Sequence, residues 1–292
     1  MEREILVRKA SGEMEPFSAD KLKGSLRRSG AEERVIEKII DEIVNWINDI
    51  NGSSEVLLTT RKIYNKAFTL LRRLTSGNAA RYKLKTAMME LGPTGHPFEH
   101  FMGQIYKVLG YEQVEVAQVL MGHAVTHEVD VVATQRIEGS KIHQHIVECK
   151  YYQTPGKNAN VQVPLYVHSR MQDIFSLRME SPKYADYTFT GGVATNTRFT
   201  SDAVAYGEYA GLKLLSWDYP QGAALRDIID RERIYPITVL SNLTRAQQEL
   251  LMDKGIVICR QLSEDPQLLR DLFIPEIRLR KLLDELEDLM RG

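Results

Sequence analysis

The sequence predicts an α/β protein whose centre alternates strands with helices and whose two ends are mostly helical. Two observations predict this class. Apolar residues recur every three or four positions in both end regions, and short runs rich in Val, Ile and Thr alternate with helical patterns between them. A cluster of helix-breaking residues at 91–97 marks the first change of pattern. We therefore expect three domains, at residues 1–91, 92–220 and 221–292.

The first region begins with a predicted β-hairpin over residues 5–17, which turns at Ser11-Gly12. Ser18 has the side chain of a helix N-cap, and it precedes Leu22 and Leu26, which share one helix face. Further helices are expected at 31–50, 59–74 and 78–91, with a loop at 51–54 and a break at Ser76-Gly77.

The middle region shows the alternation of an α/β core. Phe98, Phe101 and Ile105 line one face of a helix that is expected to end at Gly110. The other expected elements are strands at 125–135, 142–152 and 213–215, a strand with a turn at 187–195, and helices at 161–179 and 200–209.

The region after about residue 221 is predicted to be helical throughout. Its last stretch, 276–290, places Ile277, Leu282, Leu286 and Leu289 at near-heptad spacing over about two heptads. This pattern favours packing on the protein's own core, and self-association into a homo-oligomer is the open alternative.

The composition is that of an ordinary soluble protein, with 292 residues, 26% charged residues and a net charge of -1. No segment approaches the ~18 apolar residues that a membrane span needs, so no membrane partner is expected. Residues 1–9 lack the apolar core of an export signal. Cys149 and Cys259 are too few for a disulfide framework or a four-cysteine zinc site, and they fit a reducing compartment. We therefore expect a cytoplasmic protein.

The basic residues are unevenly distributed. Residues 61–85 contain eight Lys and Arg side chains and no acidic one. Such a run indicates either an anionic ligand or a solvated helical face, and charge alone does not separate these two interpretations.

A set of carboxylates and a lysine is the strongest chemical feature of the middle region. Asp130 lies in one predicted strand, and Glu148 and Lys150 lie in the next, where the two-residue period places both on one face. Neighbouring carboxylates repel each other unless a cation lies between them, and hard oxygen ligands favour Mg²⁺ or Mn²⁺. A lysine beside the metal can serve the attacking water or stabilise phosphate charge, which suits phosphodiester hydrolysis. Glu99, at the edge of the preceding helix's apolar face, would add a further metal contact. The alternative is a salt-bridged pair at a strand end.

Other polar residues of the middle region are open to two interpretations. The seven histidines lie within 96–168, but no HExxH or paired-cysteine pattern accompanies them, so a zinc site is disfavoured. His127 is a candidate active-site or phosphate-contacting histidine. Tyr166 and Arg170 share a helix face and either contact a phosphate or form a structural pair.

Several segments of the middle region follow one another in a characteristic order. They are Phe98-Glu99, Gly110-Tyr111, 128–132, 147–150 and 193–200. This order resembles the Mrr-like restriction endonucleases of the PD-(D/E)xK nuclease superfamily, over about 95–220. The resemblance implies a restriction-endonuclease-like α/β domain in which Asp130 and Glu148 hold the metal, Glu99 assists and Lys150 serves the water or the phosphate. Many Mrr-like domains have Gln where this chain has Glu148, so this chain carries the acidic form of the motif.

The first 90 residues contain a second set of matching segments. They are Val7-Arg8-Lys9, Gly12, Glu15, Phe17, Asp20-Lys21-Leu22, Thr60 and Ile63. This set resembles the ATP-cone, the nucleotide-sensing domain of ribonucleotide reductases and related regulators. The resemblance implies binding of ATP or dATP, with Lys9 and Lys21 on the phosphates, Glu15 near the base, Thr60 as a polar contact and Val7 in the matched strand.

The residues themselves support part of this interpretation. Two lysines near a helix N-terminus form an anion site, although a surface hairpin with exposed lysines has the same sequence. Ala10 stands where the family usually has an Arg. No GxxxxGK[ST] or GxGxxG motif is present, which disfavours a P-loop ATPase.

The sequence therefore predicts an Mg²⁺-dependent DNA endonuclease in which a nucleotide acts as an effector and not as a fuel. The alternative is a nucleotide-responsive DNA-binding regulator whose nuclease fold is catalytically silent. RNA cleavage is a third possibility, because a site that reads the backbone has no sequence-visible test of the sugar.

Overall fold

The computed structural model describes residues 5–9, 12–51, 57–137, 139–154 and 156–291. The chain forms two compact units: unit 1 contains residues 1–87, 237–248 and 262–292, and unit 2 contains residues 88–236 and 249–261. The change of unit after residue 87 lies close to the boundary expected at 91, and residues 221–292 are shared between the units. The division into three domains stays a prediction.

Unit 1 begins with the predicted β-hairpin. Its strands are β1 (Leu6–Arg8) and β2 (Met14–Pro16). They pair antiparallel, with Val7 opposite Glu15. Gly12 has a φ of +91°, a conformation that L side chains rarely adopt. Ser11, the other expected turn residue, lies outside the described residues.

Four helices follow the hairpin. They are α1 (Ala19–Arg28), α2 (Glu33–Asn51), α3 (Thr60–Leu74) and α4 (Ser76–Met89). The predicted N-cap of α1 is confirmed, because Ser18 Oγ accepts a hydrogen bond of 3.3 Å from the backbone N–H of Lys21. The break between α3 and α4 falls at the extended residue Thr75, one position before the expected Ser76-Gly77. Most of the expected loop at 51–54 lies outside the described residues. The core of these helices includes the fully buried Leu26, Ile36, Ile39, Ile43, Ile47 and Leu71.

The C-terminal part of the chain is helical, as predicted. Its elements are a 3-10 turn at Ile237–Val239, α9 (Arg245–Asp253), α10 (Cys259–Glu264), α11 (Gln267–Arg270) and α12 (Glu276–Arg291). Within unit 1, α12 packs against α4: Arg81 donates a hydrogen bond of 3.1 Å to the carbonyl of Leu289. A Cβ at Gly77 would lie 2.9 Å from the backbone of Asp288, so only glycine permits this approach. Self-association through α12 stays a prediction.

A buried carboxylate connects α12 to the segment before α9. Glu285 is 2% exposed and accepts hydrogen bonds from the backbone N–H of Ser241 at 2.8 Å, the backbone N–H of Asn242 at 3.2 Å and the Asn242 side chain at 2.8 Å. Glu285→Ala is expected to lower the free energy of unfolding by about 2–3 kcal/mol, because it leaves buried donors unpaired. Urea unfolding measures this loss. Asp284→Ala, at an exposed position of the same helix, is the matched control, and equal stability of the two variants would contradict the expectation.

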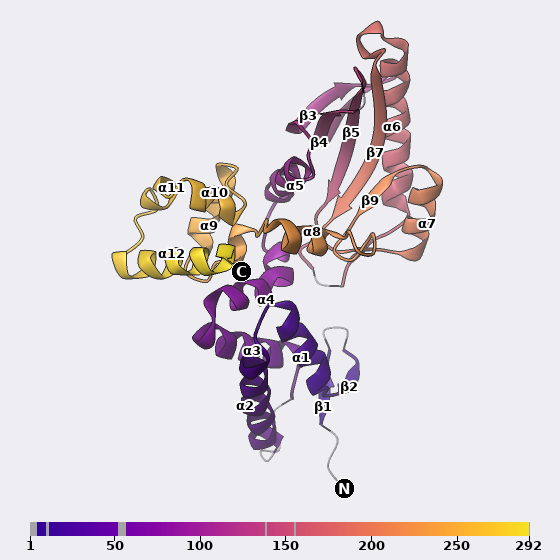
Figure 1. Ribbon diagram of the computed structural model, residues 1–292. Helices are drawn as coiled ribbons and strands as arrows, with labels where there is room; N and C mark the ends of the chain where they lie inside the picture. The colour runs from indigo at the N-terminus through magenta and orange to yellow at the C-terminus, as the bar shows by residue number, and fades with distance from the viewer. Residues whose placement is uncertain (1–4, 10–11, 52–56, 138, 155, 292) are drawn as a thin grey trace. The chain divides into compact units, whose positions relative to one another are not determined.

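Unit 2 is built around a five-stranded mixed sheet (Figure 1). Its strands are β3 (Gln113–Met121), β4 (Thr126–Arg136), β5 (Ile142–Lys150), β7 (Tyr187–Thr195) and β9 (Lys213–Leu215), in the order β3-β4-β5-β7-β9. The first three strands are antiparallel neighbours, and β7 and β9 run parallel to β5. Since β5 is central, polar side chains at its end are partly shielded from water.

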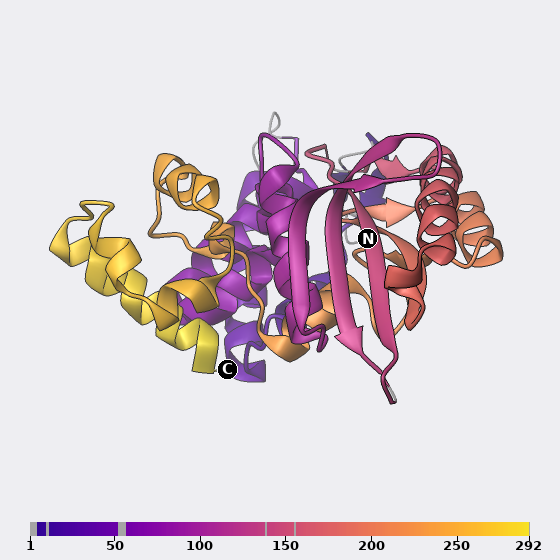
Figure 2. The ribbon, with the colours of Figure 1, turned by 90° about the horizontal axis from the view of Figure 1, so that it is seen from above.

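Helices cover both faces of this sheet (Figure 2). They are α5 (His96–Val108), α6 (Gln162–Glu180), α7 (Ser201–Tyr209) and α8 (Leu225–Glu232), with a 3-10 turn at Pro182–Tyr184 and a small pair of strands, β6 (Asn158–Ala159) and β8 (Arg198–Phe199). Successive residues of β5 show which helix lies on which face. His145 packs its ring against Tyr106 of α5, and Ile146 belongs to a core cluster with Met171 and Ile174 of α6. Thus α5 and α6 lie on opposite faces.

Two features of the sheet differ from the sequence prediction. Strand β3 was not predicted, because Val119 and Met121 point to solvent at 66% and 61% exposure and so remove the apolar alternation of a half-buried strand. The turn expected within 187–195 is absent, since Gly191 and Gly192 lie inside the continuous strand β7. Side chains there would collide with Met171 and with the ring of His145, respectively.

No helix in the described part of the chain is both long enough and apolar enough to cross a membrane.

Candidate active site

The pairing of β4 with β5 brings the predicted carboxylates together. Val131 pairs with Val147, so Asp130 and Glu148 occupy the next positions outward on adjacent strands. Asp130 Oδ2 accepts a hydrogen bond of 2.6 Å from the backbone N–H of Cys149, which holds the carboxylate at the end of β5.

Both carboxylate oxygens of the buried Glu148 are engaged by cations. Oε1 accepts a hydrogen bond of 2.5 Å from Lys150 Nζ, and Oε2 accepts one from the guanidinium of Arg170 on α6. Arg170 also donates to the carbonyl of Glu128. The Arg170 and Lys150 cations lie over the ring of Tyr166, at 5.1 and 5.9 Å from its centroid. The salt-bridged arrangement considered for the strand end is therefore present, and Arg170 is a residue of it.

A cavity of about 510 Å³ opens onto Asp130, Glu148 and Arg170, whereas Lys150 does not line it. It is lined by Val119, Thr126, His127, Glu128, Asp130, Glu148, Tyr166 and Arg170. Carboxylates and a guanidinium in one cavity are suited to a ligand that brings a cation and an anionic group together.

The site has unusual proton affinities. Burial raises the pKa of Asp130 to about 7, and the negative charges of Glu148 and Glu99 act in the same direction. Burial opposes the charge of Lys150, but the hydrogen bond to Glu148 and the charges of Glu148 and Asp130 outweigh it and raise the pKa of Lys150. At neutral pH Lys150 is therefore an ammonium group, and Asp130 is near its own midpoint of titration.

In the metal-free protein, Asp130→Asn is expected to be more stable than the wild type at pH 8 and equally stable near pH 4. The pKa of Asp130 rises from its usual 3.8 to about 7 on folding. The stability contributed by the neutral carboxyl is therefore fully present below the unfolded pKa and is lost as the pH rises through about 7. The whole effect corresponds to roughly 2–4 kcal/mol.

Chemical unfolding with a chelator present, at several pH values from 4 to 8.5, measures the difference between the two proteins. Asp186→Asn, at an exposed position where β7 begins, is the control. A stability difference that does not change with pH would show that the charge of Asp130 has no such cost.

Glu99 is placed differently from the other predicted site residues. It lies on α5, across the sheet from α6, and its Oε2 is 3.1 Å from Nδ1 of His96. Its charge reaches Asp130, but Glu99 is not among the residues that line the cavity. The structure therefore brings Asp130, Glu148 and Lys150 together and leaves Glu99 at their edge.

His127 has a partner that the sequence analysis missed. Its Nε2 lies 2.7 Å from Asp173 Oδ2 on α6, and Asp173 also accepts the backbone N–H groups of Ala124 at 2.7 Å and Val125 at 3.3 Å. The bond with His127 lowers the pKa of Asp173. Asp173 thus orients the imidazole at the cavity wall. The one sequence signal was its position three residues after Arg170, on the same face of the helix.

The donor set suits a hard divalent cation with few protein ligands. Within the ranges that the structure describes, no three or more His, Cys, Asp and Glu side chains are grouped to hold a metal ion. Asp130 and Glu148 provide two carboxylates, and Mg²⁺ commonly binds through one or two carboxylates while it keeps several waters. The raised pKa of Asp130 shows that its negative charge is costly, and a cation beside both groups would stabilise that charge.

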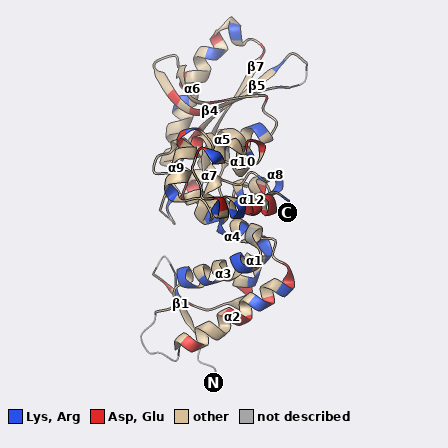
Figure 3. Cartoon of the chain, turned by 90° about the vertical axis from the view of Figure 1, so that its left-hand side faces the viewer, with Lys and Arg blue, Asp and Glu red and all other residues tan. Residues whose placement is uncertain are grey.

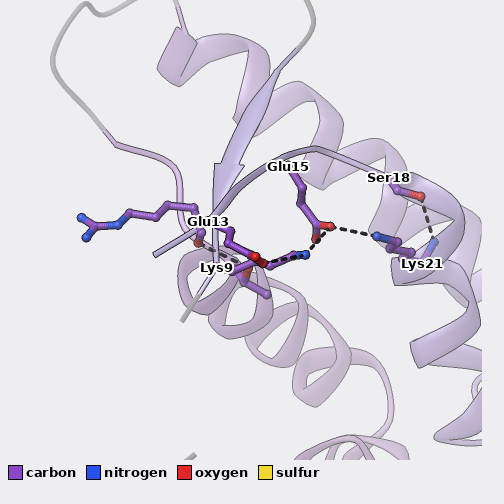
Figure 4. A network of polar contacts seen from close by, with 7 residues as sticks. Lys9, Glu13, Glu15, Ser18 and Lys21 are labelled. Carbon is purple, nitrogen blue, oxygen red and sulfur yellow. Dashed lines mark hydrogen bonds and ion pairs between the residues drawn. The ribbon is translucent and has the colours of Figure 1, made fainter. Parts of the chain in front are cut away.

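The predicted nucleotide-binding residues of unit 1 form a compact polar network (Figure 4). Glu15 Oε2 lies 3.0 Å from the ammonium groups of both Lys9 and Lys21. The hydrogen bonds from Lys9, which has the larger effect, and from Lys21 lower the pKa of Glu15. Thr60 donates a long hydrogen bond of 3.4 Å to the carbonyl of Arg8, and the side chain of Val7 is buried.

A mixed sheet between α5 and α6, with acidic and basic side chains at the end of its central strand, is consistent with a restriction-endonuclease-like α/β domain. Residues 92–219 match the family model described as restriction endonuclease, and this match confirms the resemblance of the middle region. Residues 235–290 match the model of the AF1548-like C-terminal region. Neither match includes residues 1–91.

One relative of known sequence and one of known structure each match about two thirds of this chain. The chain is 25% identical over 185 residues to an uncharacterized protein of Archaeoglobus fulgidus, an alignment that covers 63% of this chain and 97% of the relative. The crystal structure of AF1548, described as a protein of unknown function, is 23% identical, covers 68% of this chain and 100% of its own, and superposes with a TM-score of 0.54. This likeness supports the fold of the matched part.

The MspJI restriction endonuclease, solved in complex with a 27-mer oligonucleotide, is more distant. It is 14% identical, covers 62% of this chain and 36% of its own, and has a TM-score of 0.37. A similarity of this size does not define a common fold.

Proposed function

We propose that the protein is a metal-dependent DNA endonuclease that hydrolyses phosphodiester bonds. The observation that carries the proposal is the convergence of Asp130, Glu148 and Lys150 at the end of β5, beside one cavity, in a domain that matches the restriction endonuclease model. These residues are chemically matched to a scissile phosphate with its metal.

Asp130 and Glu148 would hold Mg²⁺ or Mn²⁺, and Glu99 would assist through its charge. When bound, such an ion neutralises phosphate charge and lowers the pKa of the attacking water. The cation would also offset the repulsion between the two carboxylates. Metal binding should therefore be tightest at pH values at which Asp130 is ionised.

The remaining side chains orient and stabilise. Lys150 is held as an ammonium group, so it stabilises charge on the phosphate and does not accept a proton from water. Arg170 positions Glu148 by its hydrogen bond. His127, oriented by Asp173, contacts a phosphate oxygen from the cavity wall.

Cleavage of supercoiled plasmid tests this function. Wild-type protein is expected to nick or linearise the plasmid with Mg²⁺ or Mn²⁺ and to leave it intact with a chelator. Asp130→Ala should abolish cleavage, and Asp186→Ala should retain it, since Asp186 is exposed and lies at the opposite end of the sheet. If the wild-type protein cleaved labelled RNA but left the plasmid intact with either metal, the substrate would be RNA and not DNA.

A DNA-binding regulator with a silent nuclease fold is the second candidate. The engagement of both Glu148 oxygens by Lys150 and Arg170 favours it, because a metal must compete with these two cations. DNA binding that responds to ATP, without cleavage of DNA or RNA by the wild type under either metal, would select this candidate.

We further propose that the N-terminal part of unit 1 is an ATP-cone that binds ATP or dATP as an effector. Its support is the network in which Glu15 holds the ammonium groups of Lys9 and Lys21 close enough together to share one polyphosphate. Thr60 lies next to the same hairpin.

Calorimetric titration tests nucleotide binding. Lys9→Gln with Lys21→Gln should abolish binding of ATP and dATP, whereas Lys38→Gln on the exposed side of α2 should not. ATP should also change DNA affinity or cleavage rate, since an effector acts by coupling two sites. Unchanged affinity and rate at saturating ATP would reject the coupling.

A further inference from the structure

We propose that α3 and the first turn of α4 form a second DNA-contacting surface, which binds the phosphate backbone of duplex DNA. Its centre is a cavity of about 520 Å³ within unit 1, here called the arginine pocket. The pocket is lined by Arg72, Arg73, Leu74, Thr75, Gly77, Asn78, Asp288 and Arg291. The proposal depends on the proposed function only in taking DNA as the substrate.

The arginine pocket has an excess of positive charge. Arg72 and Arg73 are exposed at the end of α3, and in the part of the chain that the structure describes neither forms an ion pair with a carboxylate. Arg72 packs its guanidinium 5.9 Å from the ring centroid of Phe68, which leaves its N–H groups for another partner. Arg291, at the end of α12, pairs with Glu287. Three guanidinium groups and the one carboxylate of Asp288 line the pocket, so an anion is the ligand that its charge fits.

Neutral donors complete this environment. Helix α4 starts at Ser76 and has 14 residues, and the backbone N–H groups of its first turn, which includes Gly77 and Asn78, have no acceptor within the helix. Guanidinium and backbone N–H groups are donors that proteins use for DNA phosphates.

The basic surface extends along α3 beyond the pocket. This extension favours duplex DNA over a free nucleotide as the ligand. Arg61 and Lys62 are exposed near the start of the helix, and Lys66 lies 5.8 Å over the ring of Trp46. Helix α3 contains no acidic residue, and Figure 3 shows Lys and Arg positions along the chain in blue. From Lys62 to Arg73 the helix rises about 16 Å. A mononucleotide fills the pocket alone, whereas duplex DNA, with one charge per about 1.7 Å of axis, engages the whole row.

Binding of the full-length protein to a fluorescein-labelled 20-base-pair duplex, in a chelator and over a range of salt, tests the surface. Arg72→Gln with Arg73→Gln is expected to weaken binding about tenfold and to reduce the slope of log Kd against log salt by about two. Arg34→Gln with Lys38→Gln removes the same charge from exposed positions of α2 and should change Kd less than twofold. Arg72→Lys with Arg73→Lys should retain most of the affinity, which separates charge from folding.

Two results would overturn the proposal. One is an equal DNA affinity and salt slope for both Gln pairs. The other is a loss of ATP or inorganic phosphate binding in Arg72→Gln with Arg73→Gln while DNA affinity is unchanged, which would assign the pocket to a small phosphate ligand. Because the assay contains no metal, an inactive nuclease site in unit 2 does not alter either result, and plasmid cleavage reports on that site separately.

Discussion

Lys150→Ala is expected to lower kcat for DNA cleavage by about 10³-fold, with little change in DNA affinity measured in a chelator. The hydrogen bond to Glu148 positions the ammonium group of Lys150 at the end of β5. Because the pKa of Lys150 is raised, the group stays charged throughout the neutral range. Its charge is worth most in the transition state, when negative charge on the phosphate increases. Binding of the ground state should therefore survive the substitution.

Single-turnover cleavage separates these two effects. Lys141→Ala is the matched control, because Lys141 is exposed and lies just before the opposite end of the same strand. Lys150→Arg keeps the charge but changes its shape, and an intermediate rate is expected for it. A Lys150→Ala variant that cleaves at the wild-type rate would mean that the lysine serves only to pair with Glu148.

Arg170→Ala is expected to destabilise unit 2 by about 3–5 kcal/mol. Arg170 is a buried cation that neutralises the buried Glu148 and also donates to the carbonyl of Glu128, so it joins α6 to both β4 and β5. Its removal leaves the buried Glu148 with Lys150 as the one cationic partner in the described part of the chain, so the carboxylate oxygen that Arg170 had engaged loses its cation. This loss is larger than that of an exposed ion pair, whose typical value is below about 1 kcal/mol.

A double-mutant cycle in urea unfolding measures this coupling. Glu148→Gln with Arg170→Met removes both charges, and it should be more stable than Arg170→Met alone. As an exposed comparison, Arg198→Ala breaks the pair of Arg198 with Asp218 and should cost little. If Arg170→Met and the double variant were equally stable, the charge of Glu148 would not be the source of the loss.

Site residues could be predicted from the sequence where their contacts follow from local rules of strand structure, and not where the contacts depend on the packing of distant elements. Asp130, Glu148 and Lys150 could be brought together because strand period and pairing of neighbouring strands are local rules. The partnership of His127 with Asp173 could not, since it depends on where α6 crosses the sheet.

The same distinction applies to the fold. The N-cap at Ser18 depends on three residues and was predicted, whereas β3 is an edge strand with apolar side chains on both faces and gave no alternation. The turn predicted within 187–195 was wrong, because a sequence does not reveal that a helix and a histidine ring need the space of the side chains that Gly191 and Gly192 lack.

The composition of unit 1 has a consequence for synthesis on the ribosome. Residues 262–292 belong to the same compact unit as residues 1–87, and Arg81 is joined to Leu289 across most of the chain. The early helices must therefore wait, incompletely buried, while all of unit 2 is translated and can fold ahead of them. At a translation rate of about 5–20 residues per second, this delay lasts roughly ten seconds or longer. Chaperone capture of the nascent chain should accordingly concentrate on the first 87 residues and end on release of the last helix.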